Sequence, residues 1–136
     1  MTPTAPIVLN GIARTILMEL APQMGAGYAG QTLQLMGALA MMLAQEFDRA
    51  AARLVEENAA LEALLADAGE PVDGRAASLR VSDLQARNRA LRGRLVDLHA
   101  RVEAQSGDAA RAFEARIWDE LRAATERRLL DMAMPS

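Results

Sequence analysis

The chain has 136 residues, of which 51% are hydrophobic but only 3% aromatic, so leucine, alanine and methionine must fill its interior. This length is typical of a single domain, residues 1–136, and the abundance of alanine, leucine, arginine and glutamate predicts helix throughout. The net charge of −3 argues against nucleic acid as a partner, and the lack of cysteine excludes disulfides and thiolate metal sites. We therefore expect an all-α, cytoplasmic protein.

The first predicted helix covers residues 5–20. Ile12, Ile16 and Leu20 recur at a spacing of four, as expected for one face of a helix that packs against a core. Pro22 and the glycines at 25, 27 and 30 follow. Because proline and glycine disfavour helix, we expect the helix to end there and a flexible connector to begin.

The second predicted helix, residues 31–68, begins with an apolar half. No charged residue lies between Glu19 and Glu46, but the continuous apolar part, Leu35 to Ala44, is only about half of the ~20 residues that a bilayer requires. We therefore expect a buried helix and no membrane contact. A helix that is apolar on all sides must be covered on all sides. This predicts a homodimer whose interface contains Met36, Gly37, Ala40, Met41, Leu43 and Ala44.

A seam of leucines with one asparagine follows, and it is repeated in the third predicted helix, residues 76–105, for which Ser82 is an alternative start. The spacing of four, three and four is typical of a coiled coil, in which a buried asparagine fixes the register. A turn over residues 69–74 would fold the two seams together. We predict a long antiparallel coiled-coil-like hairpin with Asn58 level with Asn88. Its seam contains Leu54, Asn58, Leu61, Leu65, Leu84, Asn88, Leu91, Leu95 and Leu98.

Charge favours the same pairing of helices. Residues 46–70 contain seven acids and two arginines, whereas residues 75–101 contain seven arginines and two acids. Opposite charge on facing helices contributes mainly to the specificity of pairing. A fourth helix is predicted over residues 108–132, and four helices on short connectors indicate a bundle-like arrangement.

Residues with catalytic or metal-binding chemistry are sparse. His99 is the only histidine, and Val96 occupies the position three before it, so a ferritin-type site of Glu-x-x-His pairs is excluded. The glycines over residues 25–30 do not follow a phosphate-binding order. Adjacent acids such as Glu56 and Glu57 point to different faces of a helix, so we interpret them as solvated charge. We therefore expect no catalytic, cofactor-binding or metal-binding residue, and no enzymatic activity.

These features predict a non-enzymatic interaction or accessory module. An alternative is a small-molecule binder that holds an acyl or other apolar ligand among the methionines of the helix over 31–68, since methionine-rich surfaces adapt to varied apolar partners. Core filling is the simpler interpretation of these methionines.

Several segments together resemble a known family. Residues 20–22 are Leu-Ala-Pro, Asn88–Leu91 contains Asn-x-x-Leu, and Leu121–Thr125 is Leu-Arg-Ala-Ala-Thr. Their order is similar to that in an uncharacterised family of small helical bacterial proteins, a domain of unknown function. Its genes often lie beside those of aminoglycoside-phosphotransferase-like kinases and acyl-CoA dehydrogenases.

The resemblance covers most of the chain and implies a phosphotransferase-like kinase or an acyl-CoA-linked enzyme as a partner. Family members carry an Ala-Asn-Ala-Leu-Ala element in the second helix, whereas this chain has Met-Gly-Ala-Leu-Ala over residues 36–40. Gly37 replaces the asparagine, so no role of that side chain carries over. The family supplies no catalytic residue.

Overall fold

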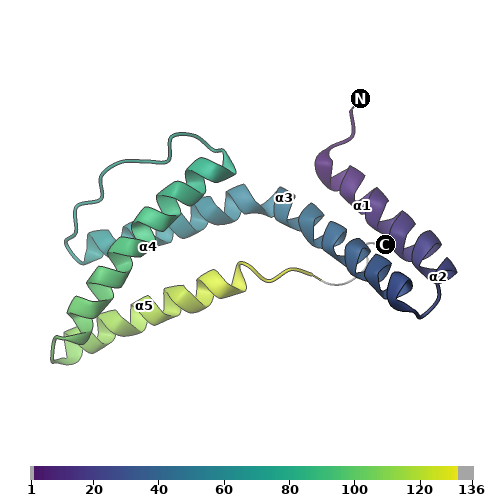
Figure 1. Ribbon diagram of the computed structural model, residues 1–136. Helices are drawn as coiled ribbons and strands as arrows, with labels where there is room; N and C mark the ends of the chain where they lie inside the picture. The colour runs from purple at the N-terminus through teal and green to yellow at the C-terminus, as the bar shows by residue number, and fades with distance from the viewer. Residues whose placement is uncertain (1, 132–136) are drawn as a thin grey trace. The chain divides into compact units, whose positions relative to one another are not determined.

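The computed structural model describes residues 2–131 and confirms an all-α, bundle-like protein that is 78% helical, without a strand in the described part. Four helices dominate: α1 (Ala5–Thr15), α3 (Tyr28–Asp67), α4 (Val81–Glu103) and α5 (Asp108–Glu126) (Figure 1). A π-helical turn, Ile16–Leu20, and the short helix α2 (Ala21–Gln23) follow α1. None of the described helices combines the length and the apolar character that crossing a bilayer demands.

The contacts within the chain divide it into two compact units, where the sequence predicts one domain. Of the described residues, 2–49 and 130–131 belong to the first unit, and 50–129 belong to the second. Helix α3 contributes its first part to the first unit and its second part to the second.

In the first unit, the first helical segment does not end before Pro22 as expected. It continues as the π-helical turn and α2, with Pro22 in the first turn of α2. Proline inside a helix has no N–H to donate and clashes with the carbonyl group four residues earlier. The wider π-helical turn accommodates that clash, since the N–H of Ala21 bonds instead to the carbonyl of Ile16, five residues earlier.

Close backbone packing then joins these helices to α3. Gly25 has a φ of +69°, which favours glycine, and a Cβ on Gly30 would lie 1.8 Å from the carbonyl oxygen of Gly25. Further along, a Cβ on Gly37 would lie 2.5 Å from Cγ of Leu17. Glycine therefore lets α3 approach the preceding helices, around a small core of Ala13, Ala40 and Met41 with Leu17 beside it.

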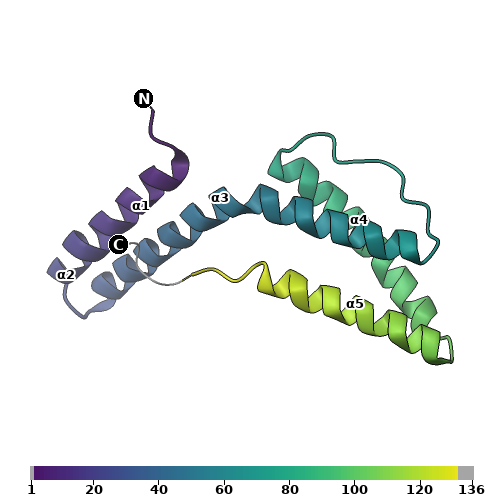
Figure 2. The ribbon, with the colours of Figure 1, turned by 180° about the vertical axis from the view of Figure 1, so that it is seen from behind.

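In the second unit, α3 and α4 run in the same direction, which corrects the predicted antiparallel hairpin (Figures 1 and 2). The Nδ2 group of Asn58 donates to the carbonyl of Leu84, near the start of α4, at 3.2 Å. Glu70, just after the end of α3, forms an ion pair with Arg101, near the end of α4. Residues later in α3 therefore contact residues later in α4, as expected for two parallel helices.

Helix α5 is the antiparallel partner of α3. Asp67, the last residue of α3, pairs with Arg116 in the first half of α5, whereas Glu57 pairs with Arg128, just after its end. Since α4 and α5 are joined by only residues 104–107, they also form an antiparallel pair. An antiparallel hairpin thus exists, but it is formed by α4 and α5, whereas α4 packs parallel to α3.

The connection over residues 68–80 explains the change of direction. Thirteen extended residues reach up to ~40 Å, whereas α3 rises only ~15 Å between Asn58 and its end. The chain can therefore return to the level of Asn58 before α4 begins. Arg87 Nη1 donates to the carbonyl of Asp73 at 2.9 Å, and Arg94 donates to that of Pro71, so side chains of α4 hold the returning segment.

Two predicted boundaries also differ. Residues 76–80 precede α4 instead of belonging to it, and the Ser78 hydroxyl accepts the N–H of Arg80 there, which satisfies the backbone without a helix. Helix α5 ends at Glu126 instead of 132, and 132 itself lies outside the described residues. The core of this unit contains Leu61, Leu64, Leu65, Leu91, Leu95, Leu98, Val102 and Ile117.

Candidate functional site

The predicted seam is buried throughout, although its helices run in the same direction. All nine residues, Leu54, Asn58, Leu61, Leu65, Leu84, Asn88, Leu91, Leu95 and Leu98, are at most 6% exposed. The two asparagines meet as expected, because Nδ2 of Asn88 donates to Oδ1 of Asn58 at 2.9 Å. The seam is therefore the interior of the second unit and is closed to partners.

The carboxylate of Glu57, which was expected to be solvated, is instead buried beside this asparagine pair. Glu57 is completely buried, and its Oε2 accepts hydrogen bonds from Arg92 at 3.1 Å, Arg128 at 2.7 Å and Asn88 at 3.3 Å. The two guanidinium groups supply the charge that a buried carboxylate requires. Because three helical segments meet at this oxygen, the network positions α4 and the end of α5 against α3.

Another arginine at this end of α5 is also firmly held. Nη1 of Arg127 donates to Oε1 of Glu120 at 2.7 Å. This hydrogen bond raises the pKa of Arg127 above its usual value, with further contributions from the charges of Glu57 and Glu56. The side chain is therefore a permanent cation that supports the fold.

The six residues predicted at a dimer interface divide between two faces of α3. Gly37, Ala40, Met41 and Ala44 are buried within the chain, whereas Met36 and Leu43 are 51% and 57% exposed. At about 100° per residue, the buried four span ~100° of the helix, on the side that faces the preceding helices. The small residues thus serve packing within the chain.

A different side of α3 carries the apolar face, which we define as Leu35, Met36, Leu39, Leu43 and Phe47. Their exposed fractions range from 47% to 65%. The five positions fall within ~120° of the helix circumference, so they form one continuous stripe. A stripe of this kind, in a region without charge from residue 20 to residue 45, is typical of a surface that another protein covers.

Two of the methionines of α3 lie apart from each other. Met36 is exposed, whereas Met41 is buried, so they lie on different sides of α3. A shallow depression does occur on the second unit, lined by Ala60, Ala63, Leu64, Arg116, Asp119, Glu120 and Ala123. It contains none of the methionines that the alternative function invokes.

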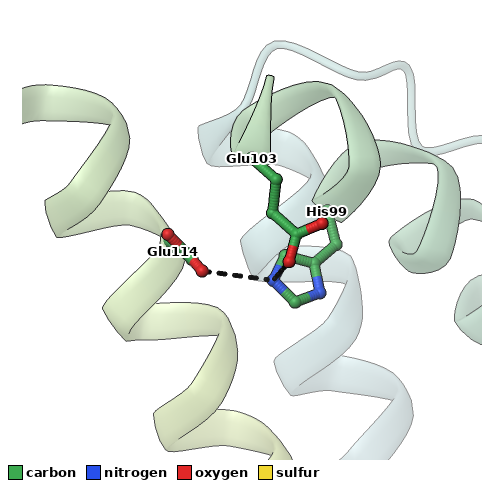
Figure 3. Close-up of side chains that lie close together, drawn as sticks. All are labelled: His99, Glu103 and Glu114. Atoms are coloured by element: carbon green, nitrogen blue, oxygen red, sulfur yellow. Dashed lines mark ion pairs between the residues drawn. The ribbon is translucent and has the colours of Figure 1, made fainter. Parts of the chain in front are cut away.

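His99 lies in a cluster with two carboxylates (Figure 3). Its Nε2 atom is 3.6 Å from Oε1 of Glu103, one turn later on α4, and 3.8 Å from Oε1 of Glu114 on α5. The imidazole also meets the ring of Trp118 edge-on, with centroids 5.4 Å apart. Nε1 of Trp118 approaches the same oxygen of Glu114 at 3.5 Å.

Two of the three side chains in this cluster could be paired from the sequence alone. His99 and Glu103 are separated by four residues, which places them on the same face of a helix. Glu114 joins them only because the short connection over residues 104–107 folds α5 back along α4. The hairpin thus adds a second carboxylate to a histidine that already has Glu103 on its own helix.

No known protein family matches this chain, and comparisons with curated proteins and with solved structures found no similar protein.

Proposed function

We propose that this protein is a cytoplasmic, non-enzymatic helical interaction module that forms a homodimer through the apolar face. The observation that carries the proposal is the row of exposed large side chains at Leu35, Leu39, Leu43 and Phe47. Exposing a row of large apolar groups to water is unfavourable, by roughly 25 cal/mol for each Å² of apolar surface. Covering the face with a partner removes that cost.

A second copy of the chain is the occupant that suits this face best. In a twofold dimer the same patch contacts itself, so the patch must be its own complement. A stripe of leucine, methionine and phenylalanine without charge meets this condition, because nothing in it repels an identical stripe.

The charges at the end of the face favour an antiparallel pairing. Glu46 and Asp48 flank Phe47, whereas the residues around Leu35 are uncharged. If two α3 helices cross antiparallel near residue 41, the end of one copy that carries Glu46 and Asp48 lies level with the uncharged residues 34–36 of the other. Along the helix axis, the Glu46 residues of the two copies are then ~15 Å apart and the Asp48 residues ~21 Å apart, at 1.5 Å per residue, so their repulsion is weak.

Sedimentation velocity of the full-length chain tests the proposal. We expect a species of twice the 14.6 kDa chain mass at micromolar concentration. Leu43→Glu places a charge in the centre of the face and should weaken the dimer at least ~10-fold, because a buried unpaired charge is costly. Val96→Glu is the matched control, since Val96 is 68% exposed on α4 in the second unit.

Circular dichroism identifies a variant that fails to fold, and Leu43→Gln then replaces it as a milder test of the same position. If the wild-type chain stays monomeric up to ~100 µM, a concentration well above the dissociation constants of most specific dimers, the homodimer is rejected. If such a monomer co-purified with a phosphotransferase-like kinase or an acyl-CoA-linked enzyme, the partner implied by the family resemblance would replace the second copy as the occupant of the apolar face. A monomer that carried an acyl ligand would favour the small-molecule binder instead.

A further inference from the structure

The side chains of His99, Glu103 and Glu114 converge on one point between α4 and α5. One ligand atom from each of the three lies within 4.8 Å of the others (Figure 3). The Nε2 atom of His99 is buried and has no hydrogen-bond partner in the described part of the chain. A buried ring nitrogen normally has a hydrogen-bond partner or binds a metal ion, so this atom is a candidate metal ligand.

The distances distinguish between two kinds of partner. At 3.6 Å and 3.8 Å, the carboxylate oxygens are too far from Nε2 for hydrogen bonds, which lie at about 2.7–3.2 Å. Ligands of a tetrahedral metal ion, each ~2.1 Å from it, are about 3.4 Å apart. The two distances from Nε2 are therefore closer to the spacing of metal ligands than to that of hydrogen-bonded groups.

We propose that His99, Glu103 and Glu114 bind one divalent transition-metal ion, with Zn²⁺ as the best-suited ion. An imidazole nitrogen selects Zn²⁺ and its neighbours over Mg²⁺ and Ca²⁺, which prefer oxygen ligands alone. The two carboxylates balance the charge of the ion. Three protein ligands leave the fourth position of a tetrahedral ion to water.

Trp118 supports one of these ligands. Its Nε1 group points at Oε1 of Glu114 at 3.5 Å, and its ring packs edge-on against His99. Groups that contact metal ligands in this way fix their orientation and strengthen binding. Because the ligands come from both α4 and α5, the ion joins the two helices of the hairpin. This inference does not depend on the homodimer.

Isothermal titration calorimetry of the full-length chain with Zn²⁺ tests the site. We expect one ion per chain, and an affinity at least ~10-fold lower for His99→Gln and for Glu114→Gln, since each removes a direct ligand. Glu126→Gln is the matched control for Glu114→Gln, because Glu126 is an exposed acid on α5, the helix that carries Glu114. Absence of Zn²⁺ binding, or equal affinity in all variants, would reject the site in favour of a simple ion pair of His99 with the glutamates.

Fluorescence locates the ion independently of its affinity. Trp118 is the only tryptophan, and Cu²⁺ bound at His99 should quench its emission strongly. His99→Gln keeps the tryptophan and should abolish the quenching, and unchanged circular dichroism shows that this variant is folded. Quenching that persists in His99→Gln would place the ion elsewhere and contradict the proposal.

Discussion

Glu57 and Asn88 show how one buried polar group depends on its neighbours. The carboxylate of Glu57 is fully buried and accepts hydrogen bonds from two arginines and Asn88. Asn88 in turn accepts a hydrogen bond from Nε of Arg92 at 2.9 Å and donates to Asn58. In a coiled coil, replacing a seam asparagine with leucine usually raises stability. Here Asn88 satisfies a buried charge, which reverses that expectation.

We predict that Asn88→Leu lowers the free energy of unfolding by ~1–3 kcal/mol, because it leaves Glu57 and Arg92 with fewer partners. Asn58→Leu should change it by less than ~1 kcal/mol, since Asn58 has no hydrogen bond to the charge and its other partner is a helical carbonyl, that of Leu84. Urea unfolding followed by circular dichroism measures both values. A gain in stability for Asn88→Leu would show that the network contributes nothing.

At the scale of an element, Gly37 and Gly93 lie in similar helical backbone but have different surroundings. A Cβ on Gly37 would overlap the side chain of Leu17, whereas a Cβ on Gly93 in α4 would have nothing within 4 Å. The approach of α3 to the helices before it therefore depends on Gly37, and the packing of α4 does not depend on Gly93.

We expect Gly93→Ala to stabilise the protein by ~0.5–1 kcal/mol, because alanine favours helix over glycine. Gly37→Ala gains the same propensity but crowds Leu17, at a cost of ~1–3 kcal/mol, so its net effect should be neutral to destabilising. Thermal unfolding of the two variants compares them directly. Equal stabilisation by both would mean that Leu17 moves aside without cost.

At the scale of the whole molecule, α3 belongs to two units with different cores. Its second part packs around the leucines of the seam, whereas its first part has only a small core and carries the apolar face. Local stability follows buried apolar contact, so the two parts of one continuous helix should open with different free energies.

If the homodimer forms as proposed, raising the protein concentration should slow amide hydrogen exchange over residues 35–47, since association stabilises the state that binds. Residues 54–65 of the same helix should exchange at an unchanged rate while the chain remains folded. Hydrogen exchange measured by mass spectrometry at two concentrations tests this. An equal effect on both segments would indicate that the interface is not confined to the apolar face.

The sequence by itself determined the helical class, the long helices and the buried seam. These follow from intrinsic helix propensity and from the periodicity of leucine, which are local properties that any neighbouring helix must satisfy. The contact between Asn58 and Asn88 was also predictable, because two polar residues in apolar seams lower their energy by meeting.

Only the tertiary structure decided the direction of the helices and the groups that meet between them. Leucine spacing and opposite net charge fit a parallel or an antiparallel pair of α3 and α4 equally well. The path of residues 68–80 selects one of them, because that segment is long enough to return and is held by Arg87 and Arg94. The cluster at His99 and the burial of Glu57 follow from that path and from the return of α5, which brings distant segments together.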